Sequence, residues 1–204
     1  MWDALSFDID DTLVQRNIAM RELLSRELSC DLIDEAMALD DREANLRLFG
    51  WLADHGRFSS PGAARSWFRR ELPNHVRPSP AVCSTLRQLA ERYALVVVSN
   101  GGAAQRRKLD NAGVSEFFVR VYVSAEARTR KPAATMFRRA ATDIGVPHAR
   151  ILHVGDDPIA DVAGAQAAGF GTCWVGADRC YPHEAPRPTF QVRDITEVPQ
   201  RLSC

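Results

Sequence analysis

The sequence has almost no lysine: among its 26 basic residues only Lys108 and Lys131 are lysines, and all others are arginines. It also has no excess charge, because 26 acidic residues balance the 26 basic ones. With no basic stripe and no polybasic run, we expect neither a nucleic-acid partner nor an anionic membrane surface. The apolar runs are far shorter than the ~20 residues that a membrane-spanning helix needs.

The cysteines show no pairing pattern, since no C-x-x-C pair occurs and the number of cysteines is odd. The five cysteines are Cys30, Cys83, Cys173, Cys180 and Cys204. Dispersed cysteines of this kind are typical of a reduced protein. No charged region precedes an apolar stretch at the N-terminus, so we expect no signal peptide and predict a cytoplasmic protein.

The 204 residues, 46% of them hydrophobic, suffice for one domain with a real core, or for one domain with an insert. The most informative stretch is Asp8-Ile9-Asp10-Asp11-Thr12, which follows the apolar start Trp2 to Phe7. Residues i and i+2 of a strand share a face, so Asp8 and Asp10 can converge on one point. Two such carboxylates indicate a metal site or covalent chemistry.

Three later segments place polar groups at comparable positions. The apolar run Leu95–Val98 ends in Ser99-Asn100-Gly101-Gly102, and Ile151–Val154 ends in Gly155-Asp156-Asp157 with Asp161 beyond. Lys131-Pro132 precedes a stretch with helical periodicity. Ligands of open α/β sheets bind outside the carboxyl ends of the strands, so these groups are expected to meet there.

From residue 80 onward, strand-like and helix-like segments alternate. Strands are predicted at 93–99, 117–124, 150–154 and 171–175, and helices at 80–92, 101–112, 132–144 and from 157 to Gly169. This alternation predicts a Rossmann-like α/β fold, a parallel sheet with helices on both faces. The Pro-rich stretch 181–188 is expected to be a loop.

Residues 15–79 do not show this alternation of strands and helices. Apolar residues there recur at helical spacing, and Pro61 and Pro73 punctuate them. The predicted organisation is a core of residues 1–14 and 80–204 with a helical insert, 15–79, after the first strand. The alternative is a helical subdomain with no lid motion.

In their order the four motifs resemble the haloacid dehalogenase-like (HAD) superfamily. They are D-x-D-x-T (Asp8, Asp10, Thr12), the strand ending in Ser99, the isolated Lys131, and G-D-x-x-x-x-D (Gly155, Asp156, Asp161). The resemblance covers about 1–14 and 80–204, and it makes the insert a type-1 cap. It is greatest to the branch of small-metabolite phosphatases that includes N-acylneuraminate phosphate phosphatases.

The resemblance implies a Mg²⁺-dependent phosphomonoester hydrolase acting through an aspartyl-phosphate. Asp8 would be the nucleophile and Asp10 the general acid and base. Mg²⁺ would be held by Asp8, Asp156 and the main-chain carbonyl of Asp10, because an all-oxygen set suits magnesium and not zinc. Lys131 would complete the catalytic set by pairing with the phosphoryl group and Asp8.

The same resemblance assigns phosphate binding to Ser99, Asn100, Gly101 and Lys131, although an N-cap is an alternative role for Ser99-Asn100. Asp161 would orient Lys131, and Thr12 would tie its loop together by a hydroxyl hydrogen bond. Asp157 is expected to cap a helix, with or without a role in supporting the site. Asp11, where many relatives carry Gly, is expected to be a turn or supporting residue, and His153 a structural histidine.

Alternative functions remain at this point. Asp10 argues against dehalogenation, which needs no proton donor, and the insert has no lysine to form a Schiff base, as the phosphonatase branch requires. A sugar phosphomutase and a catalytically silent binding or regulatory protein remain open. The expected partner is a small phosphate ester. The specificity residues considered in the insert are Arg16, Asn17, Trp51, His55, Arg57, Trp67 and Arg69. The sequence does not decide between monomer and homodimer.

Overall fold

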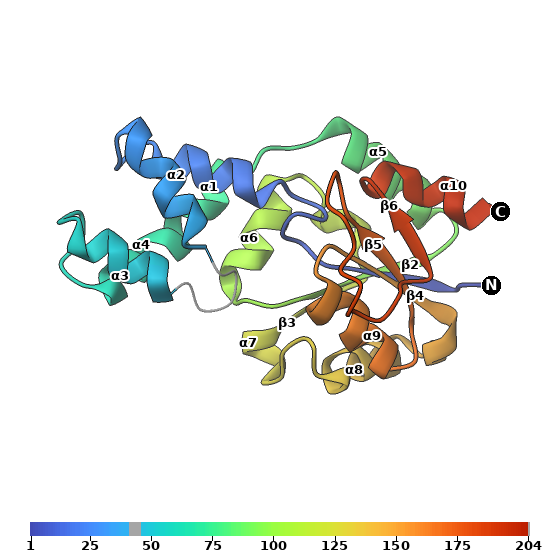
Figure 1. The fold of residues 1–204 in the computed structure, drawn as a ribbon. Helices are drawn as coiled ribbons and strands as arrows, with labels where there is room; N and C mark the ends of the chain where they lie inside the picture. Colours follow the sequence, from blue (N-terminus) through green and yellow to red (C-terminus); the bar gives the residue numbers. More distant parts are fainter. Residues whose placement is uncertain (41–45, 204) are drawn as a thin grey trace. The chain divides into compact units, whose positions relative to one another are not determined.

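The computed structural model of the protein describes residues 1–40 and 46–203. The chain forms two compact units. One consists of Met1–Val14 and Pro78–Cys204, and the other is Gln15–Arg77. We call them the core unit and the helical unit (Figure 1).

The core unit is built on a parallel sheet. Its strands are β1 (Ala4–Phe7), β2 (Ala94–Ser99), β3 (Arg120–Val123), β4 (Ile151–Gly155), β5 (Gly171–Val175) and β6 (Phe190–Val192). They lie in the order β3-β2-β1-β4-β5-β6, and every pair of neighbours is parallel. The predicted fold class is confirmed by this arrangement.

Burial on both faces explains why the central strands read as continuous apolar runs. All residues of β1 and β4 are buried, as are five of the six residues of β2. In β1, Phe7 lies in register with Val97 of β2 and with Val154 of β4. The chain positions just beyond these residues therefore share one edge of the sheet, and they carry the motifs.

Helices cover both faces of this sheet (Figure 1). The longer helices are α5 (Pro80–Ala90), α6 (Ala103–Asn111), α8 (Ala134–Ile144) and α10 (Val198–Ser203), and the shorter elements are η2 (Ser115–Phe117), α7 (Ser124–Ala127), η3 (His148–Arg150), the π-helix η4 (Pro158–Ala163), α9 (Gly164–Ala167) and η5 (Ile195–Glu197). α8 and α9 pack with β1, β2 and β4 around Phe137 and Met136. α5 packs with α10 on the opposite face.

Several predicted boundaries were wrong by a few residues for identifiable reasons. The helix predicted from Pro132 begins at Ala134, because Ala133 with its ψ of 121° is not yet helical. The strand predicted from Phe117 begins at Arg120, since Ser115–Phe117 forms a 3₁₀ turn. β6 and α10 were missed because three and six residues are too short to show a period.

The helical unit contains α1 (Arg16–Leu24), α2 (Cys30–Ala38), α3 (Leu46–Asp54), α4 (Pro61–Glu71) and η1 (Leu72–His75). Between 15 and 77 the described residues form no strand, as the sequence indicates. Ser60 caps α4, with its side chain accepting a hydrogen bond from the Ala63 N–H and Pro61 in the first turn. Phe49 and Phe68 meet edge to face, 5.6 Å between ring centroids, and join α3 to α4. The role of this unit as a cap stays a prediction.

None of the helices within residues 1–40 and 46–203 is long and apolar enough to cross a bilayer. The four described cysteines, Cys30, Cys83, Cys173 and Cys180, are free thiols. Cys204 lies outside the described residues. The loop predicted at 181–188 is confirmed, since it contains neither helix nor strand.

Candidate active site

The motif residues gather at the carboxyl edge of the sheet. Asp8 follows β1, Ser99 ends β2 and Asp156 follows β4. β1 lies between β2 and β4, so these three positions come from neighbouring strands. Asp8, Ser99 and Asp156 are buried, with 7%, 1% and 2% of their surface exposed. The core of a folded protein seldom contains so many polar groups without a function.

Lys131 is the centre of a buried ion-pair network. Its Nζ donates to Asp8 Oδ1 and to Asp161 Oδ1, each at 2.6 Å. The main chain of Lys131 is fixed as well, because the Asn100 side chain accepts from its N–H at 2.9 Å and donates to its carbonyl at 3.0 Å. One ammonium thus bridges a carboxylate from the loop after β1 and one from η4, while the Asn100 amide positions the loop that carries it.

The charges in this network shift its pKa values strongly. Burial, opposed by Lys131 and reinforced by Asp161, Asp156 and Asp10, raises the pKa of Asp8 to about 7. Burial alone would lower the pKa of Lys131, but Asp161 and Asp8 outweigh it and the pKa is raised. Burial likewise opposes the ionisation of Asp161, yet Lys131 and His153 hold its pKa below the usual range. Asp161 is thus ionised, whereas Asp8 changes between its protonated and ionised forms near neutral pH.

Three carboxylates of this edge could hold a cation. Oxygens of Asp8, Asp156 and Asp161 all lie within 4.8 Å of one another. Both oxygens of Asp161 are already engaged: Oδ1 with Lys131, and Oδ2 with the Asp157 N–H at 3.0 Å. Asp8 and Asp156 therefore fit a metal better than Asp161 does. The donors are all hard oxygens, which suits Mg²⁺.

Asp161 lies against two further residues, Gly155 and His153. A Cβ added to Gly155 would lie 2.3 Å from the Asp161 carboxyl carbon, so only glycine leaves room for this side chain. His153 is buried, and its Nε2 lies 3.1 Å from Asp161 Oδ1 while its Nδ1 lies 2.6 Å from Ser6 Oγ. Burial lowers the pKa of His153 despite Asp161. His153 lies in the core, and its structural role stays a prediction.

Helix α6 supplies two residues that the sequence analysis did not place in the site. Lys108 Nζ donates to both carboxylate oxygens of Asp10, at 2.6 and 2.8 Å. Gln105 Nε2 donates to Asp10 Oδ2 at 3.1 Å and to Ser99 Oγ at 2.9 Å. The one signal in the sequence was the rarity of lysine: both lysines of the chain pair with an aspartate of the first motif.

Asp156 also has partners that the sequence did not reveal. Arg179 Nη2 donates to Asp156 Oδ2 at 3.2 Å and to its carbonyl at 3.1 Å, and Trp174 Nε1 donates to the same carbonyl at 2.8 Å. The Arg179 guanidinium lies 5.4 Å from the centroid of the Trp174 ring. Arg179 follows β5 in a stretch without periodicity, so no sequence pattern pointed to it.

The prediction for Thr12 was wrong. Its buried hydroxyl has no hydrogen-bond partner in the described part of the chain. The loop is closed by its main chain instead, where the Ile9 carbonyl accepts from the Leu13 and Val14 N–H groups at 2.9 and 3.0 Å. Asp11 is a turn residue, as predicted, and its φ of 54° explains why glycine suits this position.

The predicted N-cap, Asp157, is confirmed, and the alternative N-cap role of Ser99-Asn100 is not. Asp157 caps the π-helix η4, with Oδ1 accepting from the Ile159 and Ala160 N–H groups at 2.8 Å each. Ser99-Asn100 is not a helix cap, because Gly102 directly precedes α6. The Gly101 N–H donates to Ser124 Oγ at 3.0 Å, so a phosphate would have to compete with this hydroxyl for it.

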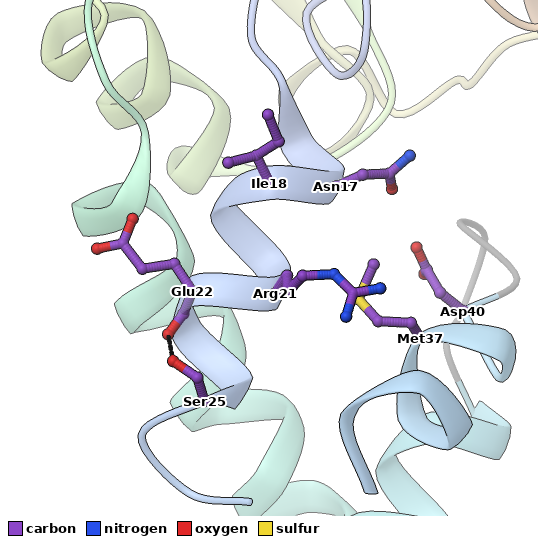
Figure 2. A pocket seen from close by; sticks show the side chains of 7 residues that line it. All are labelled: Asn17, Ile18, Arg21, Glu22, Ser25, Met37 and Asp40. Atoms are coloured by element: carbon purple, nitrogen blue, oxygen red, sulfur yellow. Dashed lines mark hydrogen bonds between the residues drawn. The ribbon is translucent and has the colours of Figure 1, made fainter. Parts of the chain in front are cut away.

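The helical unit has a cavity of about 720 Å³ along α1 and α2. Figure 2 shows its lining: Asn17, Ile18, Arg21, Glu22, Ser25, Met37 and Asp40. Arg21 is paired with Asp34 at 2.7 Å. The lining also carries the carboxylates of Glu22 and Asp40, so its charge does not favour an anionic ligand.

Of the specificity residues considered in the insert, only Asn17 lines this cavity. Arg16 is buried in an ion pair with Asp40, where its Nη2 donates to Oδ1 at 2.9 Å. The tryptophans pack within the unit: Trp51 stacks on His55, 3.8 Å between centroids, and Trp67 lies against Phe58.

The raised pKa of Asp8 leads to a stability prediction for the metal-free protein. Between pH 4 and 7 the folded protein retains a proton on Asp8 that the unfolded chain loses, so stability falls as the pH rises through this window. Asn cannot ionise, so Asp8→Asn should raise Tm by roughly 5–10 °C at pH 8 in chelator and by little at pH 4. Thermal melts of both proteins measure this, and an equal difference at both pH values would contradict it.

The comparisons with known proteins identify the family of this chain. The model of the haloacid dehalogenase-like hydrolase family matches residues 2–169. That is most of the chain, so the chain belongs to this family and is an enzyme of the hydrolase type. The resemblance seen in the motifs is confirmed.

Individual relatives show how much of the chain is shared. Pyrimidine 5'-nucleotidase YjjG of Escherichia coli is 27% identical over 221 residues, covering 98% of this chain and 98% of that protein. N-acylneuraminate-9-phosphatase of Homo sapiens is 28% identical over 136 residues, 64% of this chain and 55% of that protein. The magnesium-bound structure of the HAD-hydrolase YfnB of Bacillus subtilis has a TM-score of 0.85 at 24% identity, covering 100% of this chain and 99% of that one. This structural likeness shows the shared fold.

Proposed function

We propose that the protein is a Mg²⁺-dependent phosphomonoester hydrolase that forms an aspartyl-phosphate on Asp8. The observation that carries the proposal is the buried contact of 2.6 Å between Lys131 Nζ and Asp8 Oδ1, with Asp156 in the same oxygen cluster. An anionic carboxylate can attack an anionic phosphate ester only where positive charge neutralises both. Lys131 supplies one such charge beside the attacking group.

The metal would supply the remaining positive charge. Asp8 and Asp156 would hold it through side-chain oxygens, and the family pattern adds the Asp10 carbonyl. When bound between these residues, the ion would supply positive charge to a phosphoryl oxygen and offset the charge that develops in the transition state. The all-oxygen donor set supports this choice, as does the magnesium bound in the YfnB structure.

In the first half-reaction an Asp8 oxygen attacks phosphorus and the ester P–O bond breaks. Asp10 gives its proton to the departing oxygen, so that an alcohol leaves and not an alkoxide. In the second half-reaction Asp10, now a carboxylate, takes a proton from water as the water oxygen attacks phosphorus. The bond from phosphorus to Asp8 breaks, inorganic phosphate leaves, and both aspartates return to their starting states.

The neighbourhood of Ser99 supports a role in holding the phosphoryl group. Ser99 Oγ accepts a hydrogen bond from Gln105, and its own proton points to the Asn100 carbonyl at 3.5 Å, a long and weak contact. That proton can be redirected to a phosphoryl oxygen at little cost. Asn100 would contribute indirectly, because its amide fixes the main chain of Lys131. Gly101 would add its N–H after exchange with Ser124.

The substrate we propose is a small phosphorylated metabolite. YjjG is a pyrimidine 5'-nucleotidase and the human relative an N-acylneuraminate-9-phosphatase, so nucleoside monophosphates and sugar phosphates come first in a screen. The helical unit is the proposed source of specificity, since the core edge carries the groups that act on phosphate itself.

A panel of phosphate esters tests this function directly. We expect release of inorganic phosphate with Mg²⁺ and a loss of at least about 100-fold in rate with excess chelator, because Lys131 alone then neutralises the charge on the phosphoryl group. Adding Mg²⁺ back should restore the rate. Turnover that ignores the chelator would contradict the proposal. Isomerised sugar phosphate without free phosphate would indicate a phosphomutase, and inactivity on every ester a silent protein.

A further inference from the structure

The second lysine of the chain, Lys108, is as buried as the first. It is 4% exposed and Gln105 is 3% exposed, and both lie on helix α6. Positions i and i+3 share a helix face, so both side chains reach the same group. That group is the Asp10 carboxylate, which receives two hydrogen bonds from Lys108 and one from Gln105.

The space for this arrangement is built into the loop before α6. A Cβ on Gly101 would lie 2.6 Å from Gln105 Cγ, so a side chain at position 101 would displace Gln105. Burying a lysine and a glutamine is unfavourable unless each finds partners. Here the partners are Asp10 and Ser99, and both belong to the site described above.

We propose that Lys108 and Gln105 are positioning residues for the acid–base group Asp10. The inference rests on the proposed function. Lys108 fixes the orientation of the Asp10 carboxylate, the form that takes a proton from water in the second half-reaction, and Gln105 ties that carboxylate to the serine that holds the phosphoryl group. Proton transfer needs donor and acceptor atoms about 2.6–3.2 Å apart, so a carboxylate free to rotate would spend little time in a productive position.

The two residues have different expected signatures. The Lys108 ammonium bonds to Asp10, so Lys108→Met should lower kcat by roughly 10- to 100-fold and leave KM within about 3-fold. Gln105 bonds to Asp10 and Ser99, so Gln105→Leu should lower kcat and also raise KM. Lys108→Arg keeps the charge with a wider donor group and should recover part of the rate.

A double-mutant cycle separates positioning from a merely structural role. In an Asp10→Asn background, Lys108→Met should change kcat by less than about 3-fold, because the group it positions is already inactive. Arg106→Met is the matched control: it also removes a cation from α6, but one paired with Glu126 at 2.7 Å, and kcat should stay within about 2-fold. Equal losses from Lys108→Met in both backgrounds, or a wild-type rate in the single variant, would overturn the proposal.

Failure of this inference can be told apart from failure of the proposed function. If the wild-type protein hydrolyses no ester, the proposed function is refuted. Crystal structures of the variants would still test whether Lys108 and Gln105 position the Asp10 carboxylate. We expect the Asp10 carboxylate to turn in Lys108→Met, or in Gln105→Leu if the first variant does not fold. A carboxylate in its original orientation in both variants would refute the positioning role.

Discussion

Asp8→Asn is expected to reduce phosphate release by about 10⁴-fold or more while the fold persists. An amide nitrogen or oxygen at this position is a poor nucleophile for phosphorus, and the variant also lacks a charged ligand for the metal. Lys131 keeps its second partner, Asp161 at 2.6 Å, so the ion-pair network is not dismantled. Steady-state assays with Mg²⁺, together with circular dichroism, measure both parts of the prediction.

The matched control for this variant is Asp3→Asn. Asp3 lies just before β1, at the opposite end of the strand from Asp8, and pairs with Arg150 at the surface. Its loss should leave kcat within about 2-fold, as is usual for an exposed ion pair. A near-normal rate in Asp8→Asn would show that another group attacks the ester. Asp8→Ala should behave in the same way, since it has no side-chain atom that can attack.

Asp10→Asn is expected to slow the first half-reaction only for substrates whose leaving group needs a proton, and to slow the second half-reaction for all substrates. An amide cannot give or take the proton, so hydrolysis of an alkyl phosphate should slow by about 10²- to 10⁴-fold. A nitrophenolate leaving group needs no proton, so p-nitrophenyl phosphate should still phosphorylate Asp8. Water attack would remain slow, and a burst of nitrophenol with accumulated phosphoenzyme should follow. Rapid acid quench after radiolabelled substrate measures that phosphoenzyme.

Asp11→Asn provides the neighbouring control. Asn tolerates the left-handed conformation of this turn, where φ is 54°, so the loop should keep its shape. We expect no burst and a rate within about 3-fold of wild type. A wild-type rate on alkyl phosphates in Asp10→Asn would mean that a different group moves the proton, and the division of roles between Asp8 and Asp10 would then fall.

The sequence predicted the carboxyl ends of β1, β2 and β4 well because strand ends are local events. An apolar run that stops at a polar residue marks the end of a buried strand, and Asp8, Ser99 and Asp156 all stand at such ends. In a parallel sheet these ends share one edge, so their convergence followed from the fold class alone. Asp157 as a helix cap was equally local, since a cap depends on the next three residues.

Other parts of the site depended on side-chain contacts between distant segments. Lys108 meets Asp10 across 98 positions of the chain, and Arg179 meets Asp156 across 23. The expected hydrogen bond of Thr12 failed because the loop main chain closed on the Ile9 carbonyl and left the hydroxyl without a partner among the described residues. Such outcomes depend on ångström-scale distances and on side-chain rotamers, which the periodicity of the sequence does not predict.

The amino-acid sequence by itself determined the parallel α/β core, the helical insert and the edge of the sheet at which the motif residues meet. It could do so because strand periodicity, helix caps and turns each depend on short stretches of the chain. Only the tertiary structure decided the other charge pairs of the site: Lys108 with Asp10 and Arg179 with Asp156. Pairing depends on burial and on the direction of each side chain, and both arise only when the layers pack.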